Sequence, residues 1–98
     1  MAQVRIYQAD ILCPNKFMDY DFTMAHGGVE RKYYKTVYRG ELPARDLEDV
    51  YMLLNMGKHP EGYVGHSLST SDVVEFNGKT YFVDSFGFKE IPDFKVVQ

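Results

Sequence analysis

Residues 65–91, GHSLSTSDVVEFNGKTYFVDSFGFKEI, decide the fold, because two strand-forming runs lie at their centre with only two residues between them. Residues 72–76 and 79–84 are rich in β-branched and aromatic side chains, which favour strands. Asn77 and Gly78 separate the runs, and both tolerate the positive φ that the central positions of a type I′ turn need. The pattern therefore predicts a β-hairpin.

The turn also sets the register of this hairpin, since a two-residue loop places the flanking residues directly opposite each other. The expected pairs are Phe76 with Lys79, Val74 with Tyr81 and Asp72 with Val83 on one face, and Glu75 with Thr80 and Val73 with Phe82 on the other.

Two further strands are predicted upstream. In residues 3–8, Val4 and Ile6 fall on one face and Arg5 and Tyr7 on the other, which indicates a half-buried strand. Residues 33–39 are dense in Tyr, Thr and Val, which predicts a second strand. Its expected faces are Tyr34, Thr36 and Tyr38 on one side and Tyr33, Lys35 and Val37 on the other.

One helix of about three turns is predicted after the second strand from a single apolar stripe. The stripe, at positions i, i+3, i+4 and i+7, consists of Leu47, Val50, Tyr51 and Leu54. We expect it to be buried against the sheet, with Glu48 and Asp49 solvated near the positive end of the helix dipole. Pro43 is expected to set the backbone for the helix start, and Gly57 to follow its last turn.

The remaining segments are less regular. Residues 17–25 fit a short strand and a helical turn equally badly, and Gly27 and Gly28 predict a loop after them. Ile91 and Pro92 either end the ordered core or start a short edge strand. Phe94, Val96 and Val97 could pair along an edge, because Pro92 excludes a central strand. The elements together predict an α+β fold: a small antiparallel sheet with a C-terminal β-hairpin and one main helix packed on one face, in a single domain over residues 1–98.

The composition bounds the function. The chain has 98 residues, of which 15% are aromatic, and a net charge of −3. A chain so rich in aromatic residues can build a core without disulfide bonds or structural metal ions. The single cysteine, Cys13, excludes an internal disulfide. The negative charge argues against a nonspecific DNA binder, which needs a basic face. The start is not signal-like and no long apolar run follows, so we expect a cytoplasmic protein without a membrane segment.

A hydroxyl-rich run precedes the hairpin and is the first candidate site. One interpretation is a ligand-binding or hydrolase site around His66, Ser67 and Asp84. No Gly-x-Ser-x-Gly elbow is present, and a catalytic triad is defined by a geometry that sequence alone does not give. We expect instead that His66, Ser67, Ser69 and Ser71 bond within the protein, chiefly around the crossing loop and the Asp84–Ser85 turn. A buried hydroxyl without a partner would cost about 1–3 kcal/mol.

Metal and cofactor chemistry has no support in the sequence. The histidines lie at positions 26, 59 and 66, and neither they nor Cys13 have the spacing of a metal motif. The chain has no glycine-rich loop between a strand and a helix that would bind phosphate. We therefore expect no metal, no cofactor and no catalytic residue.

Two groups of residues are candidates for macromolecular contacts. Cations interleaved with tyrosines are typical of single-stranded nucleic-acid binding, but also of an edge strand whose charged side chains prevent pairing with another chain. The candidate nucleic-acid-binding residues are Arg31, Lys32, Lys35 and Arg39. Aromatic side chains beside a tight turn can serve as anchors for a protein partner, although both rings of the Phe86-Gly87-Phe88 turn can also belong to the core. These candidates are Tyr63, His66, Phe86, Phe88 and Phe94.

The chain resembles the YodL-like domain family in paired motifs, GHSLSTSDVV at 65–74 and YFVDSFGFKEI at 81–91. Further similarity lies, in the family's order, in residues 6–8, 37–42, 47–51 and 59–60. The resemblance covers roughly residues 4–94 and is weakest over 13–30. It implies a small protein of phages, conjugative elements and other mobile DNA in bacteria, without implying an activity, cofactor or catalytic residue.

Three interpretations follow from these observations. The first is a non-enzymatic interaction module of a mobile element that binds a protein, such as a component of a host defence system. The second is a nucleic-acid-associated accessory domain that uses Arg31, Lys32 and Lys35. The third is a small ligand-binding or hydrolase domain around His66. An exposed aromatic patch would favour the first, a continuous basic stripe the second, and a pocket shared by His66 and Asp84 the third.

Overall fold

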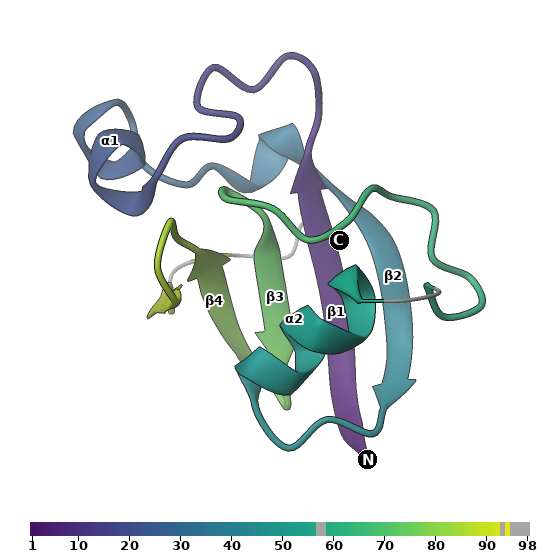
Figure 1. Ribbon diagram of the computed structural model, residues 1–98. Helices are drawn as coiled ribbons and strands as arrows, with labels where there is room; N and C mark the ends of the chain where they lie inside the picture. The colour runs from purple at the N-terminus through teal and green to yellow at the C-terminus, as the bar shows by residue number, and fades with distance from the viewer. Residues whose placement is uncertain (57–58, 93, 95–98) are drawn as a thin grey trace.

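The computed structural model describes residues 1–56, 59–92 and 94. Their five strands form one antiparallel sheet in the order β2-β1-β3-β4-β5. Figure 1 shows α2 lying across one face of this sheet, so the predicted α+β class is confirmed. The elements are β1 (Ala2–Ala9), α1 (Tyr20–Ala25), the 3₁₀ helix η1 (Arg31–Tyr33), β2 (Tyr34–Leu42), α2 (Leu47–Asn55), β3 (Val73–Phe76), β4 (Lys79–Val83) and β5 (Phe88–Glu90).

The β3–β4 hairpin has the predicted register, with Val74 opposite Tyr81 and Phe76 opposite Lys79. Asn77 and Gly78 have φ values of 50° and 89°, the left-handed pair that a type I′ turn requires. The turn is also tied to the neighbouring strand, because the Gln3 N–H donates to Asn77 Oδ1 at 2.9 Å. Asn77 therefore contributes in two ways: its backbone adopts the positive φ of the turn, and its side chain binds β1.

The first strand, β1, is an inner strand of the sheet, and its side chains contribute to two apolar clusters on opposite faces. It pairs with β2 on one side and with β3 on the other. The cluster under α2 contains Ala2, Val4, Ile6, Val37, Tyr38, Leu42, Ala44, Val50, Leu54, Leu68, Val74 and Val83. The cluster on the opposite face contains Tyr7, Ala9, Tyr34, Val73, Phe82, Ile91 and Phe94. The strand was predicted to be half-buried, but its C-terminal half is buried on both faces, because the second cluster covers Tyr7 and Ala9.

A β-bulge in β2 corrects the predicted faces of that strand. Ile6 lies opposite Tyr38, but the next residue of β1, Tyr7, lies opposite Thr36, so Val37 is the extra residue. One extra residue reverses the side to which every following side chain points. Tyr34 and Tyr38, predicted to share a face, therefore belong to opposite clusters.

The helix α2 follows the predicted stripe in part. Val50 and Leu54 are fully buried and Leu47 packs against the same cluster. Tyr51, however, is 43% exposed, so the prediction of its burial is wrong. The buried stripe is narrower than expected. Leu47, Val50 and Leu54 pack against the sheet, whereas the adjacent face of α2, which carries Tyr51, points toward solvent. The predicted C-terminal residue, Gly57, lies outside the described residues.

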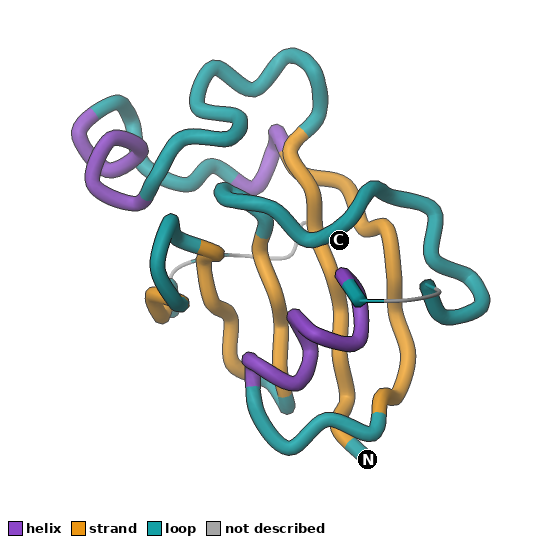
Figure 2. The backbone as a smooth tube through the Cα atoms, viewed as in Figure 1, coloured by secondary structure: helices purple, strands orange, loops and turns teal. Residues whose placement is uncertain are grey.

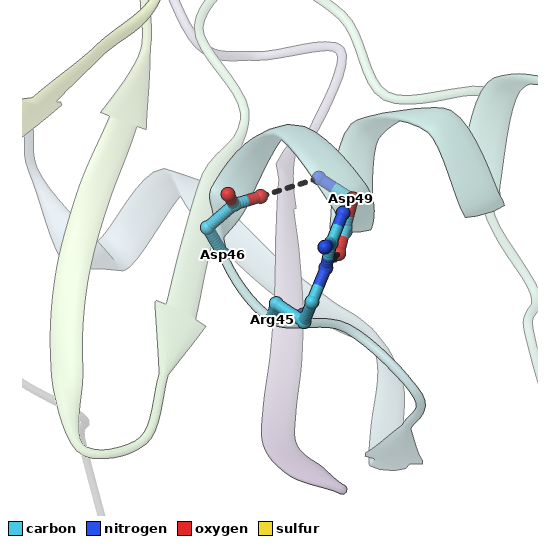
Figure 3. A network of polar contacts seen from close by, with 3 residues as sticks. All are labelled: Arg45, Asp46 and Asp49. Atoms are coloured by element: carbon cyan, nitrogen blue, oxygen red, sulfur yellow. Dashed lines mark hydrogen bonds and ion pairs between the residues drawn. The ribbon is translucent and has the colours of Figure 1, made fainter.

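The start of α2 is fixed by polar contacts rather than by Pro43, which lies upstream of the cap. Asp46 is the N-cap, and its Oδ1 accepts a 2.9 Å hydrogen bond from the Asp49 N–H (Figure 3). Asp49 in turn binds Arg45 Nε at 3.0 Å. Asp49 is therefore half-buried and paired instead of freely solvated, whereas Glu48 is exposed as predicted. The hydrogen bond from the Arg45 side chain lowers the pKa of Asp49.

The irregular segment between β1 and β2 is helical where the sequence was ambiguous. The Asp19 side chain caps the short helix α1 by accepting from the Phe22 N–H at 2.8 Å. Figure 2 shows the surrounding loops gathered at one end of the sheet. They are anchored there because the Phe17 N–H donates to Ser71 Oγ at 2.8 Å, and both residues have positive φ.

The C-terminal edge differs from the predicted one. The edge strand is β5, and Phe94 is buried in the second cluster instead of pairing along an edge. The rest of the predicted segment, 95–97, lies outside the described residues. Within the described ranges, no helix has both the length and the apolar character needed to cross a membrane.

Candidate functional site

A groove lies between α2 and the turn that joins β4 to β5. It encloses about 320 Å³, which is at the lower end of the size range of ligand sites in proteins. Its walls are two turns of a helix and the end of a strand pair, both held by the core beneath them. The lining residues are Glu48, Tyr51, Met52, Thr70, Val83, Asp84, Ser85, Gly87 and Phe88.

The apolar part of this groove comes from side chains that the core leaves exposed. Met52 is 53% exposed on α2, next to the partly exposed Tyr51. Phe88, from β5, packs against the core cluster under α2 and forms the opposite wall. Phe86 stands in the adjoining turn and is 93% exposed. An exposed aromatic ring therefore lies in the turn whose neighbouring residues, Ser85 and Gly87, line the groove. Exposed apolar side chains near a groove are expected of a surface that binds a partner.

The charged part of the groove is acidic. Glu48 lies in the first turn of α2 and is exposed, and Asp84 lies half-buried on the opposite wall. Asp84 Oδ1 accepts hydrogen bonds from the Tyr20 N–H at 3.0 Å and the Ser85 N–H at 2.8 Å. Neither carboxylate forms an ion pair with another described residue. The groove thus offers apolar contact area flanked by negative charge.

The hydroxyl-rich run is organised by a residue that the sequence did not single out, Gln8. The Gln8 side chain is buried in β1 and donates to the Asp72 carboxylate at 3.0 Å and to the His66 carbonyl at 2.8 Å. Its Oε1 accepts from the His66 N–H at 3.2 Å. The crossing loop before β3 is therefore attached to an inner strand of the sheet through one amide side chain.

Burial of this network raises two pKa values. Asp72 is almost completely buried, and desolvation raises its pKa to about 6, although hydrogen bonds from the Ser69 N–H and Gln8 act in the opposite direction. Burial, with the nearby charge of Asp72, raises the pKa of Tyr63 to about 12. The Tyr63 hydroxyl donates to the His66 carbonyl at 2.6 Å, so it also holds the loop.

The predicted internal bonding of the hydroxyl-rich run is found for most, but not all, of its members. Ser69 Oγ donates to the Ser67 carbonyl at 3.0 Å, and Ser71 Oγ accepts from Phe17. The Ser67 hydroxyl bonds to no other described residue. The bonds of Ser69 and of the His66 ring lie within the crossing loop, as predicted. Ser71 instead bonds to Phe17, and none of these side chains bonds to the Asp84–Ser85 turn in the part of the chain that the structure describes, so that part of the prediction is wrong.

His66 and Asp84 line different pockets. His66 shares one with Gln8, Lys16 and Lys35, whereas Asp84 belongs to the groove beside α2. The residues described do not include three His, Cys, Asp or Glu side chains grouped so that they could hold a metal ion.

The aromatic candidates are divided between the surface and the core. Phe86 and Phe88 belong to the groove region. Phe94 is 7% exposed, with its ring 5.2 Å from that of Tyr7, and is a core residue. Tyr63 and His66 lie on the crossing loop, where Tyr63 is half-buried and His66 exposed. The structure therefore brings together two of the five candidates at the groove.

The basic candidates do not form a stripe. The Arg31 guanidinium is 4.9 Å from the ring centroid of Tyr7 and donates to the Tyr34 carbonyl at 2.6 Å. Lys35 lies opposite Gln8 on the α2 face, whereas Arg39 lies opposite Arg5 on the other face, because the bulge separates them. Lys32 is exposed on η1.

A second apolar surface lies on the segment between β1 and β2. Its exposed members are Ile11, Leu12, Phe17, Met18, Phe22 and Met24. The groove residues of α2 and this surface were both missed by the sequence. The run Tyr51-Met52-Leu53 was the available signal, because one helix stripe cannot bury all three consecutive side chains.

Comparisons with known proteins agree with the motifs. The model of the YodL-like domain family matches residues 3–94, which is nearly the whole chain. No curated protein and no solved structure matches it. The matched region runs from the second residue of β1 through β5 and so includes nearly all of the strands and helices described above. The chain therefore belongs to the YodL-like domain family.

Proposed function

We propose that this protein is a non-enzymatic interaction module that binds a partner protein through the groove between α2 and the β4–β5 turn. The observation that carries the proposal is the exposure of Tyr51 and Met52 on one wall of the groove, with the exposed Phe86 in the turn that forms the other wall. Large apolar side chains that a domain leaves outside its core contribute to binding once a partner removes them from water, at about 25 cal/mol per Å².

Rival functions have weaker support. Nucleic-acid binding needs clustered cations, but Lys35 and Arg39 lie on opposite faces and Arg31 is engaged with Tyr7. A hydrolase around His66 needs its imidazole to be poised toward a reacting hydroxyl. Its Nδ1 instead lies 2.7 Å from the Ser67 carbonyl oxygen and 3.2 Å from Gln8 Nε2.

The family resemblance supports a particular setting for the partner. It implies mobile DNA in bacteria, where small proteins commonly act by binding a host protein. A cytoplasmic component of a host defence system is the partner class that this setting favours. This part of the proposal derives from the family context rather than from the geometry of the groove.

The test compares matched surface variants as bait in a bacterial lysate. The double variant Met52→Ser and Phe86→Ser removes one exposed apolar side chain from the groove lining and the exposed ring from the adjoining turn. Ile11→Ser is the control, because Ile11 is 89% exposed on the other apolar surface. We expect the wild type and the control to capture the same protein and the groove variant to lose it, with melting temperatures unchanged. Equal capture by the groove variant would contradict the proposal.

A further inference from the structure

We propose that the partner contributes an extended segment that adds to β5 as a further strand of the sheet, with an apolar side chain in the groove and basic side chains beside it. This inference rests on the proposed function and deepens it, because it names the chemistry of the segment. Strand addition is a common mode of peptide recognition, in which backbone hydrogen bonds supply affinity and side-chain pockets supply specificity.

The first argument is that β5 is an edge strand, with no strand of the described residues on its outer side. In an antiparallel ladder, successive residues alternate between bonding to the neighbouring strand and pointing away from it. The Ile91 N–H donates to the Thr80 carbonyl at 2.9 Å, and the Asp84 N–H to the Gly87 carbonyl at 3.0 Å. Residues 87, 89 and 91 therefore face β4, so the N–H and C=O groups of Phe88 and Glu90 point outward along the edge.

The second argument is the position of the groove relative to this edge. Phe88 faces the α2 side of the sheet, where it packs against the core cluster. Alternation places Glu90 on the same side. A strand paired with β5 would lie about 4.8 Å from it and would direct every second side chain toward α2. One such side chain would meet the cavity beside Tyr51 and Met52.

The third argument is charge complementarity. Glu48 and Asp84 line the groove, and Glu90 lies exposed on the bordering strand. None of the three forms an ion pair with another described residue. Lysine or arginine two positions before and after the apolar residue would lie on the same side of the added strand. The favoured partner segment therefore has the sequence pattern basic-x-apolar-x-basic, in which x is any residue.

The opposite edge of the sheet is a poorer site for strand addition. The Val64 N–H donates to the carbonyl of the bulge residue Val37 at 2.9 Å, so the crossing loop occupies the middle of the β2 edge. A bulge and a covering loop are features that protect an edge from pairing.

The test uses an acetylated, amidated heptapeptide, Thr-Lys-Val-Phe-Thr-Lys-Val, titrated into the ¹⁵N-labelled protein. One control peptide carries glutamate in place of both lysines. A second is N-methylated at the backbone positions that would pair with β5. We expect chemical shift changes at Met52, Phe88 and Glu90, slower amide exchange at Phe88 and Glu90, and at least ten-fold weaker binding of both controls. The Glu48→Lys and Glu90→Lys double variant should reverse the preference between lysine and glutamate peptides.

The possible results separate this inference from the proposed function. Binding without protection of the Phe88 and Glu90 amides, equal binding of the N-methylated peptide, or no binding at millimolar concentration would each overturn strand addition. If lysate capture nevertheless depends on Met52 and Phe86, the groove binds a partner in another manner, and only the strand model is lost. If capture is independent of both residues, the proposed function is lost as well.

Discussion

The Gln8 amide donates a 3.0 Å hydrogen bond to the Asp72 carboxylate, although 64 positions separate the two residues in the sequence. Gln8 belongs to the inner strand β1 and Asp72 directly precedes β3. Because both side chains are almost completely buried, the bond forms where water cannot replace it. The contact therefore fixes the crossing loop on the sheet.

Replacing Gln8 by leucine should destabilise the fold. The change preserves the approximate size of the side chain but leaves the Asp72 carboxylate with fewer donors and the His66 backbone without its partner. Hydrogen bonds to charged groups contribute about 1.5–3 kcal/mol, so the free energy of unfolding should fall by at least that amount. Urea unfolding measures this free energy. Gln3→Leu, on the exposed face of the same strand, is the control and should change stability by less than about 0.5 kcal/mol.

The raised pKa of Asp72 predicts a pH dependence of stability. The folded state titrates at about 6, and the reference value is 3.8, so between these values the folded protein holds more protons than the unfolded chain. The free energy of unfolding should therefore gain from this group as the pH falls from 7 toward 4, and lose that gain as the pH rises through 6. Urea titrations at several pH values should show the gain in the wild type and a smaller gain in Asp72→Asn. Parallel curves for the two proteins would contradict the assignment to Asp72.

The hairpin turn should tolerate asparagine but not valine at position 78. Gly78 has a φ of 89°, which a β-branched residue adopts only with strain. Gly78→Val should lower stability by about 1–3 kcal/mol, whereas Gly78→Asn should lower it less, because asparagine visits this region more readily. Thermal unfolding followed by circular dichroism distinguishes them. A valine variant that melts with the wild type would show that the turn relaxes to another type.

Two adjacent leucines in α2 should differ sharply when truncated. Leu54 is fully buried, so Leu54→Ala should cost about 2–5 kcal/mol through lost contacts and a residual cavity. Leu53 is 37% exposed, so Leu53→Ala should cost about 1 kcal/mol or less. Chemical denaturation of both variants provides the comparison, and similar losses would mean that α2 is rotated about its axis relative to the sheet.

The elements that could be read from the sequence are those specified by neighbouring residues. Asn77 and Gly78 define a turn within two positions, and their turn sets the register of β3 and β4. Val50 and Leu54 define the buried line of α2 in the same local way. The bulge at Val37 could not be read, because its cause is a tertiary contact: the extra residue presents a carbonyl to the Val64 N–H.

The candidate site was only partly predictable for the same reason. Phe86 and Phe88 were identified because a glycine between two phenylalanines is locally unusual. Tyr51 and Met52 were not, because their exposure depends on how α2 is rotated against the sheet. Gln8 was overlooked because a glutamine within an alternating strand reads as a solvated residue, and only the folded crossing loop encloses it.

The position of β1 inside the sheet affects the order in which the protein can assemble. Its partners are residues 34–42 and 73–76, so β1 is enclosed on both sides only when β3 has paired with it. Until then Val4, Ile6 and Tyr7 lack most of their final neighbours. Pairing between distant segments slows folding, because the chain loses loop entropy before it gains contacts. The pairing of β1 with β3 therefore adds a slow step to the assembly of the sheet.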